Sequence, residues 1–212
     1  MSESSARVRG LYAVTPDLAD TVRLVTLVSA ALQGGARIVQ YRNKVAAPEL
    51  KLEQARALKS ACVRHGAMLI VNDDVEIALA VDADGVHLGR DDSFGPDVRK
   101  KLGPGKLIGV SCYRSLERAR SAVAEGADHV AFGGFFPSQV KPGAGGAPIE
   151  LLTQAKSELE VPVVAIGGIT PENGKALVAA GADALAVITA LFTAPDVAAA
   201  AAQFNALYDA QH

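Results

Sequence analysis

The chain has 212 residues, with 21 Lys and Arg against 23 Asp and Glu, a formal net charge of −2 and no Trp. Half of the residues are hydrophobic and 21% are charged, a composition typical of a folded α/β protein that excludes a disordered or fibrous chain. The charge balance offers no basic surplus for nucleic acid or for an anionic membrane, so any anion must be bound by a local group of residues.

Short β-branched runs alternate with longer amphipathic stretches along the whole chain. The predicted strands cover residues 11–15, 37–41, 68–71, 85–88, 107–110, 129–132, 161–166 and 184–188. Helical spacing is clearest over residues 50–64, 115–125 and 171–180. Strands that alternate with helices predict a parallel sheet, and this number of evenly spaced units is what a closed barrel requires. We therefore expect one (β/α)8 TIM barrel that spans residues 1–212.

A short turn of small residues precedes four of the predicted strands. It occurs at residues 34–36, 82–84, 126–128 and 181–183, in most copies with a Gly-Ala-Asp pattern or a close variant. Gly supplies the left-handed turn that ends a helix, while Ala and Asp hold the short connection into the next strand. The weak repeat favours closure of the barrel, and no linker or low-complexity tract divides the chain.

The sequence also predicts a cytoplasmic location. Cys62 and Cys112 are far apart and have neither a CxxC nor a metal-ligand spacing, which favours free thiols in a reducing compartment. Residues 1–9 are polar and lack the apolar core of a signal peptide. The uncharged stretch 184–195 is too short to span a bilayer. The sequence does not determine the oligomeric state and is compatible with a homo-oligomer.

Active sites of such barrels lie at the C-terminal ends of the strands, so the residues that follow each predicted strand are the candidates. After the second strand, alternation places Gln40, Arg42 and Lys44 on one side of the chain and Tyr41 and Asn43 on the other. Two cations and an amide at a barrel mouth suit a polyanion, because Arg can fork onto phosphate oxygens. The alternative is an ordinary solvated loop.

Acidic residues follow the third and fourth strands. Asp73 and Asp92 are candidates for Mg²⁺, which proteins hold with one or two carboxylates together with substrate phosphates and water. The alternative for such residues is N-capping of the next helix, and Asp74 and Asp91 fit that alternative well.

A long Gly-rich loop follows the sixth predicted strand and runs from residue 135 to about residue 147. Loops of this length in a compact barrel are usually lids or binding loops, although an unconstrained connection is the alternative. Lys141 in this loop would bring a further cation over the site.

The last two strand ends predict a phosphate site. Gly167 and Gly168 lead directly into a helix, and Ile188 and Thr189 end the eighth strand. Backbone N–H groups at these positions form the recurrent phosphate site of such barrels, although a tight turn alone would also explain the glycines. The sequence shows no Ser–His–Asp set. The four histidines are expected to be packed or exposed rather than paired with a nucleophile: His65, His87, His129 and His212.

Taken in order, these stretches resemble the thiamine phosphate synthase family over nearly the whole chain. The matching runs are 10–17, 39–44, 70–73, 83–92, 109–111, 132–141, 164–170 and 182–189. The resemblance implies a Mg²⁺-dependent transferase of thiamine biosynthesis. Such an enzyme joins 4-amino-2-methyl-5-hydroxymethylpyrimidine pyrophosphate to 4-methyl-5-hydroxyethylthiazole phosphate, and it releases pyrophosphate.

The resemblance also implies roles for individual residues. The catalytic positions that it implies are Arg42, Lys44, Ser111 and Lys141. The substrate-binding positions are Gln40, Tyr41, Asn43, Asn72, Ser138, Gln139, Val140, Gly168, Ile188 and Thr189, and the metal ligands are Asp73 and Asp92. Gln40 and Asn72 would join the catalytic residues around the pyrimidine pyrophosphate. Residues 138–140 with Gly168, Ile188 and Thr189 would receive the thiazole phosphate.

Two positions depart from the pattern of the family. Val140 stands where the family has a second hydroxyl residue, which predicts weaker binding of the thiazole phosphate. Tyr113 stands where many relatives, the thiazole tautomerase branch among them, carry His. Two alternatives stay open at this point: a tautomerase-like or other phosphate-binding barrel isomerase, which needs a general base, and a non-catalytic phosphate-ligand binding protein.

Overall fold

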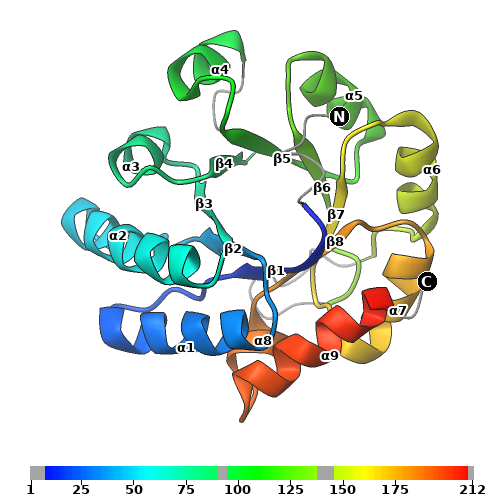
Figure 1. Ribbon diagram of the computed structural model, residues 1–212. Helices are drawn as coiled ribbons and strands as arrows, with labels where there is room; N and C mark the ends of the chain where they lie inside the picture. The colour runs from blue at the N-terminus through cyan, green and yellow to red at the C-terminus, as the bar shows by residue number, and fades with distance from the viewer. Residues whose placement is uncertain (1–7, 90–94, 138–145, 210–212) are drawn as a thin grey trace.

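The chain folds as a closed eight-stranded parallel barrel surrounded by helices (Figure 1). The computed structural model describes residues 8–89, 95–137 and 146–209. The strands are β1 (Gly10–Val14), β2 (Ile38–Tyr41), β3 (Met68–Asn72), β4 (Gly85–Leu88), β5 (Leu107–Tyr113), β6 (His129–Gly133), β7 (Val163–Ile166) and β8 (Ala184–Val187). Each strand pairs with its neighbour in the chain, and β8 closes on β1 with Ala184 opposite Gly10. The predicted TIM barrel is confirmed.

Helices follow the strands and form the outer layer (Figure 1). They are α1 (Thr21–Gln33), α2 (Pro48–Arg64), α3 (Val75–Ala80), α4 (Pro96–Leu102), α5 (Leu116–Ala124), α6 (Glu150–Glu158), α7 (Pro171–Ala179), α8 (Thr189–Phe192) and α9 (Val197–Asp209). The side chain of Asp74 accepts a hydrogen bond of 2.9 Å from the backbone N–H of Ile77, so Asp74 caps α3 as its position suggested. Among the described residues, no helix has the length and apolar character needed to cross a membrane.

The predicted strands agree with the observed ones to within a few residues. The largest differences are at β5, which extends to Tyr113 through a shift of register after Ser111, and at β7, which begins only at Val163. The late start of β7 follows from Pro162, because proline has no N–H to donate to a neighbouring strand.

The aspartates of the repeated turn explain why that turn recurs. Asp84 accepts a hydrogen bond of 2.8 Å from the N–H of Leu69 on the preceding strand and forms an ion pair of 2.8 Å with Lys59. Asp128 and Asp183 make the equivalent contacts with the starts of β5 and β7, and their cationic partners are Arg99 and Lys156. Each aspartate therefore ties a strand start to its neighbour strand and to a nearby helix.

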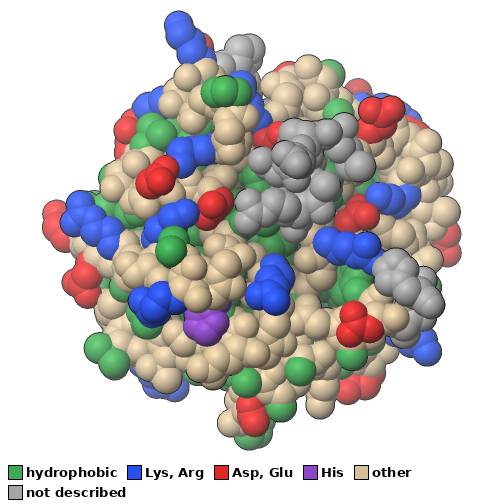
Figure 2. All heavy atoms as spheres, in the orientation of Figure 1, with side chains coloured by type: hydrophobic (Ala, Val, Ile, Leu, Met, Phe, Trp, Pro, Cys, Tyr) green, Lys and Arg blue, Asp and Glu red, His purple; other side chains and the backbone are tan. Residues whose placement is uncertain are grey.

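Two apolar regions lie on either side of the barrel wall. The larger one packs between the strands and the helices, and Cys62 and Cys112 are buried there as free thiols. The smaller one fills the barrel interior and is formed by Val8, Tyr12, Val14, Ile38, Met68, Ile70, Leu107, Ala131, Val164, Ala184 and Ala186. On the outer surface shown in Figure 2, basic and acidic side chains are interspersed, as the small net charge predicts.

Candidate active site

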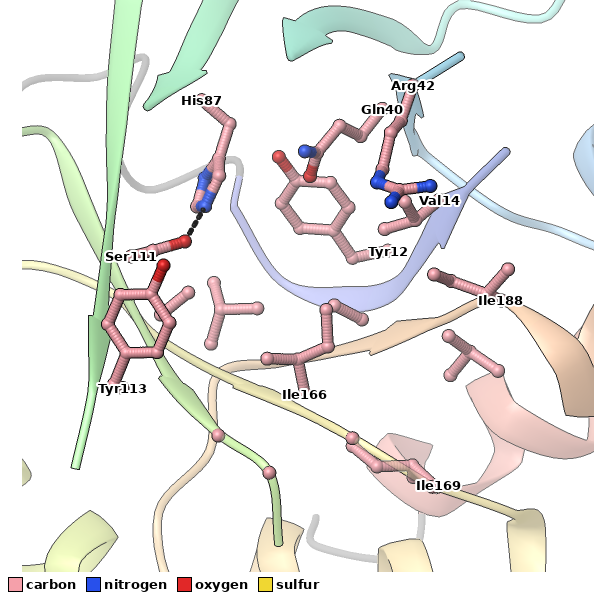
Figure 3. A pocket seen from close by; sticks show the side chains of 18 of the residues that line it. Tyr12, Val14, Gln40, Arg42, His87, Ser111, Tyr113, Ile166, Ile169 and Ile188 are labelled. Carbon is pink, nitrogen blue, oxygen red and sulfur yellow. Dashed lines mark hydrogen bonds between the residues drawn. The ribbon is translucent and has the colours of Figure 1, made fainter. Parts of the chain in front are cut away.

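A cavity of about 920 Å³ opens at the C-terminal ends of the strands, and residues from all eight strands or the segments just after them line it. Its two sides differ in chemistry (Figure 3). Polar side chains come from β2 to β5, whereas the opposite side, formed by β6 to β8 and β1, is lined mainly by aliphatic side chains and glycine. A cavity with two such sides suits a ligand that has both an anionic part and an apolar part.

The first polar element is the end of β2 with the segment that follows it. Gln40 donates a hydrogen bond of 2.7 Å from Nε2 to Oδ1 of Asn72 at the end of β3, and both line the cavity. The backbone of Arg42 is fixed by Thr15, whose hydroxyl accepts from the Arg42 N–H and donates to its carbonyl oxygen, both at 2.9 Å. The side chains of Gln40 and Arg42 therefore reach the cavity together (Figure 3).

Asp17, in the segment after β1, contacts the side chain of Arg42 and the backbone of Lys44. Its carboxylate accepts hydrogen bonds from Nη1 of Arg42 at 3.1 and 3.3 Å, and its Oδ1 atom also accepts the backbone N–H of Lys44 at 2.8 Å. The Arg42 side chain is only 15% exposed, whereas that of Lys44 is 56% exposed. Arg42 is thus a fixed donor beside the cavity, and the ammonium group of Lys44 is largely hydrated.

Asp73 directly follows β3 and faces the same side of the cavity. Its backbone has φ = 63°, a left-handed conformation that is uncommon for a residue other than glycine. Its Oδ2 atom lies 3.7 Å from Nζ of Lys44, and its N–H donates to the carbonyl oxygen of His87 at 2.9 Å. A carboxylate held in a conformation of this kind at a barrel mouth is typical of a functional site.

Ser111 and His87 form a hydrogen-bonded pair on the polar side of the cavity. Oγ of Ser111 lies 2.9 Å from Nε2 of His87, as the dashed line in Figure 3 shows. His87 is buried, as expected for a packed histidine, but its hydrogen bond with Ser111 was not anticipated from the sequence. Alternation along β4 and β5 points the side chains of His87 and Ser111 into the barrel. The register between the two strands, which brings these side chains together, cannot be read from either segment alone.

His129 lies deeper in the barrel, with its ring centroid 5.7 Å from that of His87 and 6.0 Å from that of Tyr12. Neither ring nitrogen of His129 has a hydrogen-bond partner among the described residues, and burial lowers the pKa of His129 to about 4. Gly109 makes room for both imidazoles, because a Cβ there would lie 2.1 Å from Nε2 of His129 and 2.6 Å from Nδ1 of His87. His129 is therefore a neutral, packed histidine, as expected.

The opposite side of the cavity contains the glycine turn after β7. Gly167 and Gly168 have φ values of 112° and 61°, and a Cβ on Gly168 would lie 2.2 Å from the carbonyl oxygen of Pro137. Gly168, Ile188 and Thr189 line the cavity, with the side chain of Ile166 beside them. The two glycines are therefore required for close packing of backbone against backbone, whatever ligand the site holds.

Tyr41 and Asn43 occupy a different place from the one predicted. Neither lines the main cavity. The Tyr41 hydroxyl donates to Oε1 of Gln54 at 2.9 Å, and Nδ2 of Asn43 donates to the carbonyl oxygen of Leu18 at 2.8 Å and to Gln54 at 3.0 Å. The prediction that Tyr41 and Asn43 bind substrate in this cavity is therefore corrected. Both are buried and link the end of β2 to α2, because alternation turns them outward when Gln40 and Arg42 face inward.

Some predicted residues lie outside the part of the chain that the structure describes. They are Asp92 and the four loop residues Ser138, Gln139, Val140 and Lys141. The structure adds three residues that reasoning from the sequence did not select: Asp17, His87 and Arg118. Asp17 and Arg118 could have been noticed as charged residues near strand ends, but only the fold shows which atoms they contact.

Comparisons with known proteins point to one family. The family model described as thiamine monophosphate synthase matches residues 11–191. The thiamine-phosphate synthase of Aromatoleum aromaticum is 50% identical over 204 residues, which cover 96% of this chain and 98% of that protein. That of Chromobacterium violaceum is 54% identical over 195 residues, covering 92% and 94%. Among solved structures, a thiamine phosphate pyrophosphorylase from Pyrococcus furiosus has a TM-score of 0.85 at 34% identity and covers 99% of this chain and 98% of its own.

Proposed function

The chain belongs to the thiamine monophosphate synthase family and is a thiamine-phosphate synthase, and we propose that the two sides of its cavity divide the two substrates between them. The polar side would hold the pyrimidine pyrophosphate, and the side formed by β7 and β8 would admit the thiazole phosphate. The observation that carries this proposal is the convergence of Gln40, Arg42, Asn72 and Asp73 on one side of one cavity.

The reaction requires stabilisation of charge more than transfer of a proton. As the bond between carbon and oxygen breaks, positive charge grows on the pyrimidine methylene carbon and negative charge grows on the departing pyrophosphate. The thiazole nitrogen then attacks that carbon, so no nucleophile of the enzyme is required. Fixed cations beside the leaving oxygens lower the barrier, because they are oriented before the reaction begins. Alignment of the two substrates in one cavity contributes further.

Arg42 is the residue best placed for this electrostatic role. Its guanidinium is anchored on one side by Asp17, which leaves its other N–H groups able to donate to phosphate oxygens at the cavity. Lys44 follows two residues later with a more exposed side chain, and Lys141 would add a third cation by resemblance alone. The Oγ atom of Ser111, oriented by His87, would contact the pyrimidine.

The donor set of this side also fits Mg²⁺. Asp73 offers a carboxylate that faces the cavity, and Asn72 offers an amide oxygen next to it. Both are hard oxygen donors, and one or two carboxylates suffice when substrate phosphates and water complete the shell. Asp73, with Asp92 as the second carboxylate by resemblance, would hold the ion, which when bound would neutralise charge on the leaving pyrophosphate.

The thiazole phosphate would lie against the turn after β7. Gly168 and Thr189 place backbone groups at the cavity without bulky side chains, while Ile166 and Ile188 supply an apolar surface for the thiazole ring (Figure 3). Residues 138–140 would complete this site by resemblance. This arrangement would bring the thiazole nitrogen towards the pyrimidine carbon from the side opposite the pyrophosphate.

A direct assay tests the proposal. The purified protein is mixed with both substrates in the presence of Mg²⁺ and, separately, with excess EDTA, and thiamine phosphate and pyrophosphate are quantified. We expect both products in equal amounts with Mg²⁺ and a loss of turnover in EDTA that added Mg²⁺ restores. Turnover that survives chelation would contradict the metal site. An absence of product under both conditions would contradict the transferase.

A further inference from the structure

Arg118, on α5, joins the ends of two neighbouring strands. Its Nε atom donates to the carbonyl oxygen of Ser111 on β5 at 2.8 Å, and its Nη2 atom donates to the carbonyl oxygen of Gly89, which directly follows β4, at 3.0 Å. The side chain also lines the cavity. One planar guanidinium therefore bridges the two strand ends just beyond their last paired residues, and no other side chain type has donors in that rigid geometry.

The strand end that Arg118 holds is irregular. The pairing of β5 with β6 shifts between Ser111 and Tyr113, and Tyr113 has φ = 54°. A bulge of this kind interrupts the regular ladder of a strand and redirects side chains, and it is common beside active sites. A hydrogen bond to the carbonyl oxygen of Ser111 therefore stabilises the backbone at the point where the ladder becomes irregular.

Arg118 is itself anchored to the segment that contains this bulge. The hydroxyl of Ser115 accepts the backbone N–H of Arg118 at 3.0 Å, and the N–H of Ser115 donates to the carbonyl oxygen of Cys112 at 2.9 Å. Backbone and side chain of Arg118 thus both attach to the segment from Ser111 to Ser115. The guanidinium cannot shift relative to the bulge without breaking these bonds.

The two strand ends carry the two halves of one side-chain pair. Ser111 lies on β5, and His87 lies on β4 two residues before Gly89. The distance of 2.9 Å between their side chains depends on the relative position of the strand ends. The backbone pairing of β4 with β5 extends to Leu88 and Val110, and Arg118 bridges the two strands directly beyond that point. We propose that Arg118 is a positioning residue for the synthase reaction, which holds Ser111 and His87 in register beneath the pyrimidine. This role rests on the proposed contact of Ser111 with that substrate.

Two variants and a matched control test the role of Arg118. Arg118→Lys keeps the charge but has a single nitrogen in place of the Nε and Nη2 atoms that reach the two carbonyl oxygens, and Arg118→Ala removes both hydrogen bonds. Arg120→Lys is the control, since Arg120 lies on the same helix and pairs with Glu158 instead. We expect kcat to fall about ten- to a hundredfold in Arg118→Ala and less in Arg118→Lys, with little change in the control. Added guanidinium chloride at millimolar concentration should restore part of the activity of Arg118→Ala.

A double-mutant comparison separates positioning from a structural role. If Arg118 acts through Ser111, the loss from Arg118→Ala should be much smaller in a Ser111→Ala background than in the wild type. The inference would be overturned if Arg118→Ala lowered activity by the same factor in both backgrounds. A wild-type kcat/KM in the Arg118→Ala enzyme would also overturn it. A wild-type protein without turnover would contradict the proposed function instead, so the two failures are distinguishable.

Discussion

Asp17, which does not line the cavity, binds Arg42, which does, with Nη1 of Arg42 at 3.1 Å from Oδ2 and 3.3 Å from Oδ1. Because Asp17 follows β1 and Arg42 follows β2, this contact connects two neighbouring strand ends. The carboxylate cancels part of the positive charge of the guanidinium but fixes its direction. Asp17 thereby orients Nη1 of Arg42, and under the proposed function the other N–H groups donate to the pyrophosphate.

Loss of Asp17 should weaken binding of the pyrimidine pyrophosphate. In Asp17→Ala, Arg42 and the backbone of Lys44 lose their common acceptor, and we expect the KM for this substrate to rise about five- to tenfold. Asp17→Asn keeps an acceptor oxygen and should show a smaller rise. Steady-state kinetics at fixed thiazole phosphate measure the effect, and an unchanged KM in Asp17→Ala would contradict the role of this contact.

Gly168→Ala should damage the thiazole side of the cavity. The new Cβ would lie 2.2 Å from the carbonyl oxygen of Pro137, at a position where φ is already 61°. We expect a loss of roughly 2–4 kcal/mol in unfolding free energy and a higher KM for the thiazole phosphate.

Gly66→Ala is the matched control, because Gly66 has φ = 62° but a Cβ added there would meet no other atom within 4 Å. Only the backbone strain remains at that position, so the loss should be about 1 kcal/mol with unchanged kinetics. Urea unfolding of both variants measures the difference. Equal losses in the two would show that the close approach to Pro137 has no energetic consequence.

His129 should make the stability of the protein depend on pH. Burial lowers its pKa from 6.5 to about 4 in the folded chain, so between these values the unfolded chain binds a proton that the folded chain does not. Stability is therefore lost as pH falls from about 6.5 towards 4, with a contribution of about 2 kcal/mol between pH 7 and pH 5. Urea unfolding at both pH values should show a smaller loss for His129→Gln than for the wild type. An equal loss in both proteins would contradict the assignment.

Val140→Thr should improve use of the thiazole phosphate. Val copies the shape of Thr but has no hydroxyl, and one hydrogen bond contributes about 0.5–1.5 kcal/mol, which corresponds to a KM lowered by about two- to tenfold. The measurement is the KM for the thiazole phosphate at saturating pyrimidine pyrophosphate. A KM that does not fall would show that the missing hydroxyl is not what limits binding.

The barrel and the location of its site could be predicted from local patterns. Alternating strands and helices imply closure, and the rule that sites follow the strands led directly to Gln40, Arg42 and Asp73, which line one cavity. Alternation also separated Gln40 and Arg42 from Tyr41 and Asn43 correctly. The expectation that residues 40–44 all contact substrate was too broad for this cavity, since Tyr41 and Asn43 bind Gln54 of α2 instead.

Contacts between strands could not be predicted in the same way. The pairing of His87 with Ser111 depends on the register of β4 against β5, and the bridge made by Arg118 depends on where α5 packs. Both are properties of the closed barrel, because a shift of one residue in a strand would turn every side chain to the other face. The contact of Asp17 with Arg42 likewise becomes visible only once β1 and β2 are known to lie side by side.

A crystal structure of the protein with Mg²⁺, pyrophosphate and thiamine phosphate would test the proposed division of the cavity most directly. The account predicts pyrophosphate in contact with the side chain of Arg42 beside Asp73, and the phosphate of thiamine phosphate against Gly168 and Thr189. Pyrophosphate bound out of reach of Arg42, or the two anions in exchanged positions, would contradict it.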